Sequence, residues 1–247
     1  MTGFERKNRM ETAPQLRRVL NVLPHGKEYT VIANLPKNSV SLAIQAEQAG
    51  ADAILLNVDG DDSSYPGHFG SYDLHDVYIN DAVSTVSVPC GIGIGGAKPL
   101  TEEYWERIIA TPFSFVEMYA HQMPLHVLSD TRVKKIVAIA TGYILEQVKE
   151  LSRQDGVDAL DVAIVPPLGR GNPFSALDYA TLRLISELSA KPLLLRTQKK
   201  LTASDLAKVL KLGVKGLVAD PTAFSGTDET YKDELAGLIS RRPESEQ

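Results

Sequence analysis

The stretch that decides the fold reads YTVIANLPKNSVSLAIQAEQAGADAILLNVDG and covers residues 29–60. Its first part, residues 29–35, is a short apolar run rich in β-branched side chains, which predicts a strand buried on both faces. Residues 40–49 place apolar side chains at helical spacing and end at Gly50, a residue that commonly terminates helices. Residues 53–58 repeat the buried-strand pattern. A strand, a helix and a strand with short connections predict a βαβ unit whose strands are parallel.

The same alternation of strand and helix continues along the chain. Further strands are expected at residues 89–96, 113–120, 134–142, 159–167, 191–198 and 214–222. Helices are expected at residues 76–86, 101–110, 143–156, 175–189, 202–213 and 228–239, with a short helix after Pro124. Eight units in unbroken order favour a closed (β/α)8 barrel, the TIM-barrel fold, over an open doubly wound sheet, because closure leaves no strand edge. A chain of 247 residues suits a single α/β domain of this kind.

Three segments are expected to lie outside this repeat. Residues 1–28 form an extension, in which residues 4–22 predict an extra N-terminal helix that closes the bottom of the barrel. The tail at 241–247 is expected to be disordered, because it is polar and terminal. A long polar loop, DGDDSSYPGHFGSYDLHDVYIN, follows the second strand, and long loops in compact domains are usually functional or mobile.

Composition narrows the class of protein. The formal net charge of -5 argues against nucleic-acid binding, which needs a basic face. The sequence has no apolar run near the roughly 20 residues of a membrane span, and its N-terminus lacks the apolar core of a signal peptide, so we expect a cytoplasmic protein. The single cysteine, Cys90, lies in an apolar strand and is interpreted as core.

Chemistry in a (β/α)8 barrel takes place at the carboxyl ends of the strands. Because side chains alternate between the two faces of a strand, the outward aliphatic residues identify the inward polar ones. The residues expected around one mouth are Asn34, Asn57, Asp59, Glu117, Thr141, Arg196 and Asp220. Three carboxylates beside one arginine are costly unless they are solvated, paired or bound to a ligand. This favours a functional site over a polar network that only fills the top of the barrel.

Glycines and cations add to the expected site. The inward glycines of GIGIGG, residues 91–96, leave room for a ligand close to the backbone. Lys98, Arg170 and Lys199 lie in loops that follow strands, where cations commonly receive phosphate or carboxylate groups.

The sequence patterns for a Schiff-base lysine and for a metal site are both weak. A Schiff-base lysine belongs near the end of a strand, but Lys134 opens its strand, which leaves the loop residue Lys98 as the candidate. A metal site has no tight motif, although Asp59 and Glu117 together could hold Mg²⁺.

Two segments resemble a known group of barrels. The segment SLAIQAEQAGADAILL resembles the first helix and second strand of N-acylmannosamine-6-phosphate 2-epimerases and related sugar-phosphate-binding barrels. PLLLRTQKKLTASDLAKVLKLGVKGLVADPTAF has the layout of their seventh and eighth units. The resemblance implies a sugar-phosphate substrate, a catalytic lysine near Lys98, and phosphate held by glycine-rich turns and a helix N-terminus. Those glycines are largely absent here, so either Lys199 and Lys200 replace them or no phosphate binds there.

A second resemblance is to the phosphoenolpyruvate mutase and isocitrate lyase group. It rests on the short turn after the first strand, the AGAD helix end and the acidic end of the second strand. It implies a Mg²⁺-dependent lyase. The acidic motif that this group carries after the third strand is missing, because GIGIGG contains no carboxylate.

The sequence therefore predicts an enzyme acting on a small anionic, oxygen-rich metabolite, such as a sugar phosphate. Proton abstraction beside a carbonyl would lead to isomerisation, epimerisation or carbon–carbon lysis, with Glu117 as the base and Asp59 as a second acid or base. Lys98 and Arg196 would stabilise the oxyanion. The residues expected to bind substrate are Asn34, Asn57, Thr141, Arg170, Arg196, Lys199 and Asp220. The alternative is a non-catalytic metabolite-binding or regulatory barrel, and either form could be a homo-oligomer that pairs through its outer helices.

Overall fold

The computed structural model describes residues 30–60, 69–96, 98–224 and 229–241. The predicted N-terminal helix at 4–22, its extension at 1–28 and most of the tail lie outside these residues. Part of the long polar loop, residues 61–68, does so as well.

Eight parallel strands close into a barrel in sequence order, which confirms the predicted (β/α)8 fold. They are β1 (Thr30–Asn34), β2 (Ala53–Val58), β3 (Cys90–Ile94), β4 (Phe115–Tyr119), β5 (Lys134–Ala140), β6 (Ala159–Ala163), β7 (Leu193–Arg196) and β8 (Gly216–Ala219). Strand β1 pairs with both β2 and β8, so the sheet has no open edge. Cys90 is buried at the start of β3.

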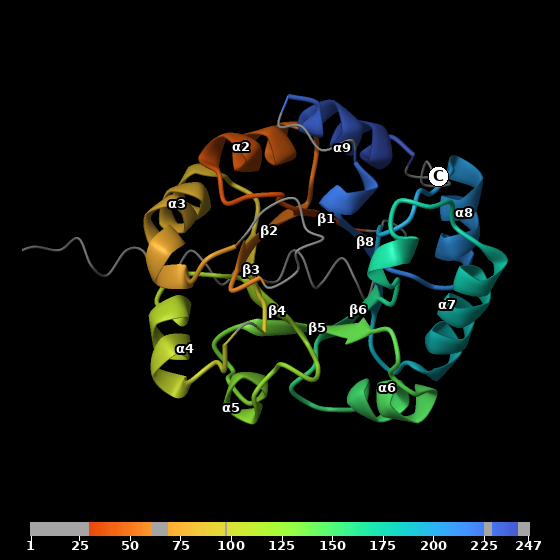
Figure 1. The fold of residues 1–247 in the computed structure, drawn as a ribbon, viewed down its shortest axis with the longest axis horizontal. Coiled ribbons are helices and arrows are strands. Elements are labelled where there is room, and N and C mark those ends of the chain that lie inside the picture. Colours follow the sequence, from red (N-terminus) through yellow and green to blue (C-terminus); the bar gives the residue numbers. More distant parts are fainter. Residues whose placement is uncertain (1–29, 61–68, 97, 225–228, 242–247) are drawn as a thin grey trace, which may run out of the picture.

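Helices form a ring around the barrel, with α2 and α9 in contact at one side (Figure 1). The ring comprises α2 (Val40–Gln48), α3 (Tyr72–Thr85), α4 (Glu102–Ile109), α5 (Leu125–Leu128), α6 (Leu145–Leu151), α7 (Ala176–Leu188), α8 (Ala203–Lys211) and α9 (Tyr231–Ile239). Two 3₁₀ turns, η1 (Pro167–Gly169) and η2 (Pro221–Ala223), follow β6 and β8. In the described part of the chain, every helix falls short of the length and apolarity needed to cross a membrane.

The start of α3 differs from the prediction, because the helix begins at residue 72 instead of 76. Its first turns carry the exposed side chains of Leu74, Val77 and Tyr78 beside the buried ring of Tyr72. Apolar residues on both faces weaken the amphipathic pattern from which a helix start is read.

Aliphatic and aromatic side chains from seven strands fill the interior of the barrel below its mouth. They are Ile32, Ala53, Leu55, Phe115, Ile136, Ala159, Leu194 and Val218. Phe115 is the largest, and its ring lies where a side chain on Gly91 would project. This apolar layer forms the floor of the barrel interior beneath the polar residues at the strand ends.

We expect Gly91→Ala to lower the free energy of unfolding by about 1–3 kcal/mol, the usual range for overpacking a core. The added methyl group would overlap the Phe115 ring, which the surrounding core prevents from moving. Urea unfolding would measure the loss. The control is Gly237→Ala in α9, where a methyl group meets no atom within 4 Å and should stabilise the helix. Equal effects of the two substitutions would contradict this packing.

Candidate functional site

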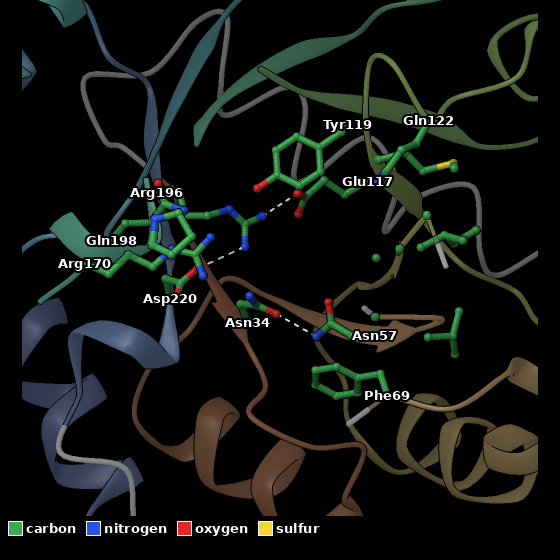
Figure 2. Close-up of a pocket in the computed structure, with 18 residues that line it drawn as sticks. Asn34, Asn57, Phe69, Glu117, Tyr119, Gln122, Arg170, Arg196, Gln198 and Asp220 are labelled. Atoms are coloured by element: carbon green, nitrogen blue, oxygen red, sulfur yellow. Dashed lines mark hydrogen bonds and ion pairs between the residues drawn. The ribbon is translucent and has the colours of Figure 1, made fainter. Parts of the chain in front are cut away.

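A cavity of about 410 Å³ opens at the carboxyl ends of the strands (Figure 2). Its polar lining comes from Asn34, Asn57, Glu117, Tyr119, Gln122, Arg170, Arg196, Gln198 and Asp220. Phe69 and the glycines at 93, 95 and 96 form the rest of one wall. Residues more than 180 positions apart in the chain thus share one cavity, as the strand-end argument predicts for Asn34, Asn57, Glu117, Arg196 and Asp220.

Arg196, at the end of β7, is the centre of a buried ionic cluster. Its Nε and Nη2 atoms each lie 2.7 Å from Oδ2 of Asp161. Nη1 lies 3.3 Å from Oδ2 of Asp220, and Nη2 also donates to Oε1 of Glu117. A guanidinium group that serves three carboxylates is held in one orientation. Arg196 therefore fixes the other members of the cluster.

Asp161 belongs to this cluster and was missed in the sequence analysis. It lies in β6 with its side chain fully buried, between Leu160 and Val162, which pack against the helices. The same alternation that identified Glu117 could have placed Asp161 inside the barrel. Burial raises the pKa of Asp161, and the charge of Arg196 opposes that rise.

A pair of amides forms the opposite side of the cavity. Nδ2 of Asn57 donates to Oδ1 of Asn34 at 2.7 Å and to the carbonyl of Leu35 at 3.3 Å. Asn38 holds the backbone of Asn57 on both sides, because its side chain bonds to the N–H at 3.0 Å and to the carbonyl at 2.6 Å. Figure 2 shows the two amides facing Glu117 and Arg196 across the cavity. The pair offers fixed amide groups to a bound ligand.

Tyr119, Gln122 and Gln198 add uncharged polar groups to the lining. Burial raises the pKa of Tyr119 to about 12, so its hydroxyl stays protonated and can donate a hydrogen bond. Oε1 of Gln198 accepts from the N–H of Val165 at 3.1 Å, which ties the loop after β6 to the cavity. The two glutamines follow strand ends in loops, where alternation no longer assigns a direction. Strand alternation therefore does not predict Gln122 or Gln198 as lining residues.

The prediction that Asp59 faces the mouth is wrong. Asp59 follows β2 with a positive φ of 52°. The alternation of side chains between the two faces of the strand therefore stops at Val58 and does not set the direction of Asp59. Its Oδ2 accepts a hydrogen bond of 2.8 Å from the Tyr104 hydroxyl, which in turn accepts from the N–H of Tyr72 at 2.6 Å. Burial raises the pKa of Asp59. The side chain thus ties β2 to α4 and α3 and does not line the cavity.

Three other predicted residues also lie away from the cavity. Lys98 is exposed, and its charge acts on Asp59. Nζ of Lys199 lies 2.7 Å from Oδ2 of Asp178 in α7. The Thr141 hydroxyl donates to the carbonyl of Ile164 at the surface. Arg170, which was predicted with them, does line the cavity.

The glycines in and just after β3 leave room for protein side chains. A Cβ on Gly93 would lie 2.5 Å from Oδ1 of Asn57, and a Cβ on Gly96 would overlap the Gln122 amide. Gly93 is paired in register with both Asn57 and Glu117, so it separates the amide from the carboxylate. The predicted ligand space is therefore taken up partly by the groups that line the cavity.

Carboxylates already occupy two places where a (β/α)8 barrel commonly binds phosphate. The N-terminus of α8 is closed by a capping box between Thr202 and Asp205. After β8, Oδ1 of Asp220 accepts from the N–H of Thr222 at 2.9 Å and from its hydroxyl at 2.6 Å. The expected cradle of glycine N–H groups is thus not formed by these residues.

A second, more basic cavity of about 940 Å³ lies beside the first. Arg170 lines both cavities, and Lys199, Lys200 and Arg241 are the other cations of the second one. Among the described residues that line it, Glu234 is the acidic one. Anion recognition near the mouth would therefore depend on side-chain cations.

Metal ligands are not gathered in the described ranges, which contain no group of three or more His, Cys, Asp or Glu residues suited to a metal ion. Glu117 lines the cavity while Asp59 bonds to Tyr104, so the carboxylate pair predicted for Mg²⁺ is not brought together.

No protein-family model and no curated protein matches the sequence. Solved structures do match. The chain is 12% identical to the YdjI aldolase from Escherichia coli K12, with a TM-score of 0.54 over 90% of this chain and 91% of that one. It is 13% identical to a mutant tryptophan synthase alpha-subunit from Pyrococcus furiosus, with a TM-score of 0.64 over 86% and 96%. At this identity the likeness shows the (β/α)8 fold, and it does not single out the epimerase type of barrel.

Proposed function

We propose that this protein is an enzyme that moves a proton at a carbon beside a carbonyl group of a small, anionic, oxygen-rich metabolite. The observation that carries the proposal is the Glu117 carboxylate, which lines the cavity and is held by the buried Arg196. A fixed carboxylate facing amides and a phenol is suited to acid–base chemistry on an oxygenated substrate. The two solved structures compared above are named as an aldolase and a tryptophan synthase subunit, which agrees with a catalytic barrel.

Glu117 is a better base than Asp220, the other carboxylate of the lining. Asp220 uses Oδ1 for Thr222 and Oδ2 for Arg196, so both of its oxygens serve the fold. For Glu117 the described contacts engage Oε1, and the side chain borders the cavity. Oε2 is the atom that would take the proton from the substrate.

The remaining lining would bind and polarise the substrate. Tyr119 would donate to the carbonyl oxygen on which negative charge develops, because burial keeps its phenol protonated. The amides of Asn34 and Asn57 would orient hydroxyl groups. Because Arg196 is engaged by three carboxylates, we assign recognition of the anionic group to Arg170 instead. The adjoining basic cavity supports a phosphate or carboxylate group at that end of the substrate.

We expect Arg170→Met to raise KM by roughly tenfold to a hundredfold and to change kcat less. A hydrogen bond to a charged group contributes about 1.5–3 kcal/mol. Contacts to an anionic group far from the reacting carbon stabilise the bound substrate and the transition state equally, so their loss raises KM more than it changes kcat. Steady-state kinetics would measure the two constants. An unchanged KM would remove Arg170 from substrate recognition.

The test of the proposal is a screen for carbon–hydrogen exchange. Hydroxy acids, keto acids, sugars and their phosphates would be incubated with the protein in deuterated water, and NMR would follow the loss of each signal beside a carbonyl. The proposal predicts exchange or conversion of one chemical class. If several compounds raise the melting temperature and none exchanges or reacts, the protein is a non-catalytic metabolite-binding barrel.

A further inference from the structure

We propose that the Arg196 cluster holds one proton at neutral pH, that Asp161 carries it, and that Asp161 is a positioning residue which fixes Arg196 beside Glu117. The catalytic part rests on the proposed function, whereas the protonation is a property of the fold alone. The Arg196 cluster consists of Arg196, Glu117, Asp161 and Asp220.

Charge balance in a buried cluster calls for the proton. The exposed fractions of the four side chains are 8%, 9%, 0% and 2% for Arg196, Glu117, Asp161 and Asp220. With all groups ionised, one guanidinium would face three carboxylates, which leaves two negative charges in excess. Buried charge without a partner is strongly unfavourable, and like charges favour protonation of one carboxyl group.

The contacts indicate which carboxylate is protonated. Asp220 accepts three hydrogen bonds, from Arg196 and from two atoms of Thr222, and such bonds favour the ionised form. Glu117 borders the cavity, where a ligand or solvent can reach it. Asp161 uses only Oδ2, and its buried Oδ1 has no hydrogen-bond partner among the described residues. An ionised oxygen left without a partner is costly, so the neutral form is favoured there.

The surroundings of Asp161 agree with this choice. Arg196 on β7 is the cation that faces it, and Glu117 on β4 and Asp220 after β8 are the anions. On the neighbouring strands its register partners are Ala138 in β5 and Leu194 in β7, which carry no charge. Tyr119 on β4 is a further titratable group near Asp161. Burial raises the pKa of Asp161, in line with the geometry.

The consequence for catalysis is a division of roles. Environments that separate the protonation states of neighbouring carboxyl groups assign an acid and a base. With the proton on Asp161, the guanidinium charge of Arg196 is left to Glu117 and Asp220. Glu117 is then ready to accept a proton from the substrate, and Asp161 acts on the reaction only through Arg196.

Unfolding equilibria across pH test the protonation without any substrate. A carboxyl group with a raised pKa binds a proton in the folded state that the unfolded chain has released, so stability falls as pH rises above the ordinary carboxyl value of about 4. The ratio of the unfolding constants of the wild type and Asp161→Asn should therefore grow about tenfold per pH unit between pH 5 and pH 7. Other titrating groups are common to both proteins and cancel.

Two outcomes of that experiment would overturn the proposal. A ratio that stays flat from pH 5 to pH 7 would show that Asp161 is ionised in the folded protein. Failure of Asp161→Asn to fold would show that a charge is needed there. A second readout uses the wild type labelled with ¹³C at aspartate carboxyl groups, where one resonance should keep its protonated shift at pH 6. The control is Asp59→Asn, which removes the other buried aspartate whose pKa is raised and must leave that resonance in place.

Kinetics then test the positioning role separately. Asp161→Asn imitates the protonated side chain, so it should keep kcat at pH 7 and lose any decline of activity at alkaline pH. Asp161→Ala removes the bond to Arg196 and should lower kcat with little change in KM, and Asp161→Asn serves as the rescue. If the stability data hold and both variants turn over like the wild type, the proton is present but the positioning role is wrong.

Discussion

Arg196→Met is expected to lower the free energy of unfolding by about 3–5 kcal/mol, the range found when one partner of a buried ion pair is removed. Methionine nearly matches the length of the arginine stem, so the loss would come from charge. Three carboxyl groups would remain in a space where the side-chain exposed fraction is at most 9%. Chemical denaturation at pH 7 would measure the loss.

The pH dependence of this variant shows the cause. Without the guanidinium group, the three carboxyl groups repel one another, and protonation relieves that repulsion. The deficit of Arg196→Met relative to the wild type should therefore shrink as pH falls from 7 toward 4. Adding Glu117→Gln and Asp161→Asn should restore part of the stability at pH 7.

Arg132→Met is the matched control for this result. Arg132 also pairs with two carboxylates, those of Glu106 and Asp130, but its side chain is 51% exposed. Exposed ion pairs contribute little to stability. If the two methionine variants lose stability equally, the Arg196 cluster is not the buried ionic centre described here.

Glu117→Gln is expected to lower kcat by roughly 10²–10⁴-fold, the contribution typical of a positioned acid or base. The glutamine side chain has the same shape, and its carbonyl oxygen can still accept the hydrogen bond from Arg196. Folding should therefore be retained, which circular dichroism and the melting curve would check. The kinetic assay would use the substrate class found by hydrogen exchange.

The matched control is Asp59→Asn, because Asp59 is a buried carboxylate that bonds to Tyr104 and does not line the cavity. We expect its kcat to stay within a factor of a few of the wild type. A large loss for Asp59→Asn with a small loss for Glu117→Gln would exchange the roles of the two residues.

The sequence was sufficient to predict the barrel and most of its mouth. Residues 29–60 show the βαβ unit, and the structure repeats that unit around a closed sheet. Alternation along each strand places Glu117 and Arg196 inside, because their neighbours Val116 and Leu195 pack outward in the core. Such periodicity reports the direction of a side chain as long as the strand continues.

The errors lie where the strand periodicity ends. Asp59 follows its strand at a positive φ, so its side chain leaves the mouth. Lys199 is in a loop, and the position of its ammonium group is set by the ion pair with Asp178. Asp178 lies in the first turn of α7, which is distant from Lys199 in the sequence. Neither contact has a signal in local sequence. Asp161 is different, because the alternation of side chains along β6 does point it into the barrel. It is a single carboxylate within an apolar strand, and it was not counted among the polar residues of the mouth.

The most direct test of the account is a crystal structure of Glu117→Gln with the substrate that the exchange screen identifies. We predict that the carbon beside the carbonyl lies against the side chain at position 117, with the anionic group of the substrate at Arg170. A substrate bound outside the cavity, or turned so that its reactive carbon faces away from position 117, would contradict the assignment of Glu117 as the base.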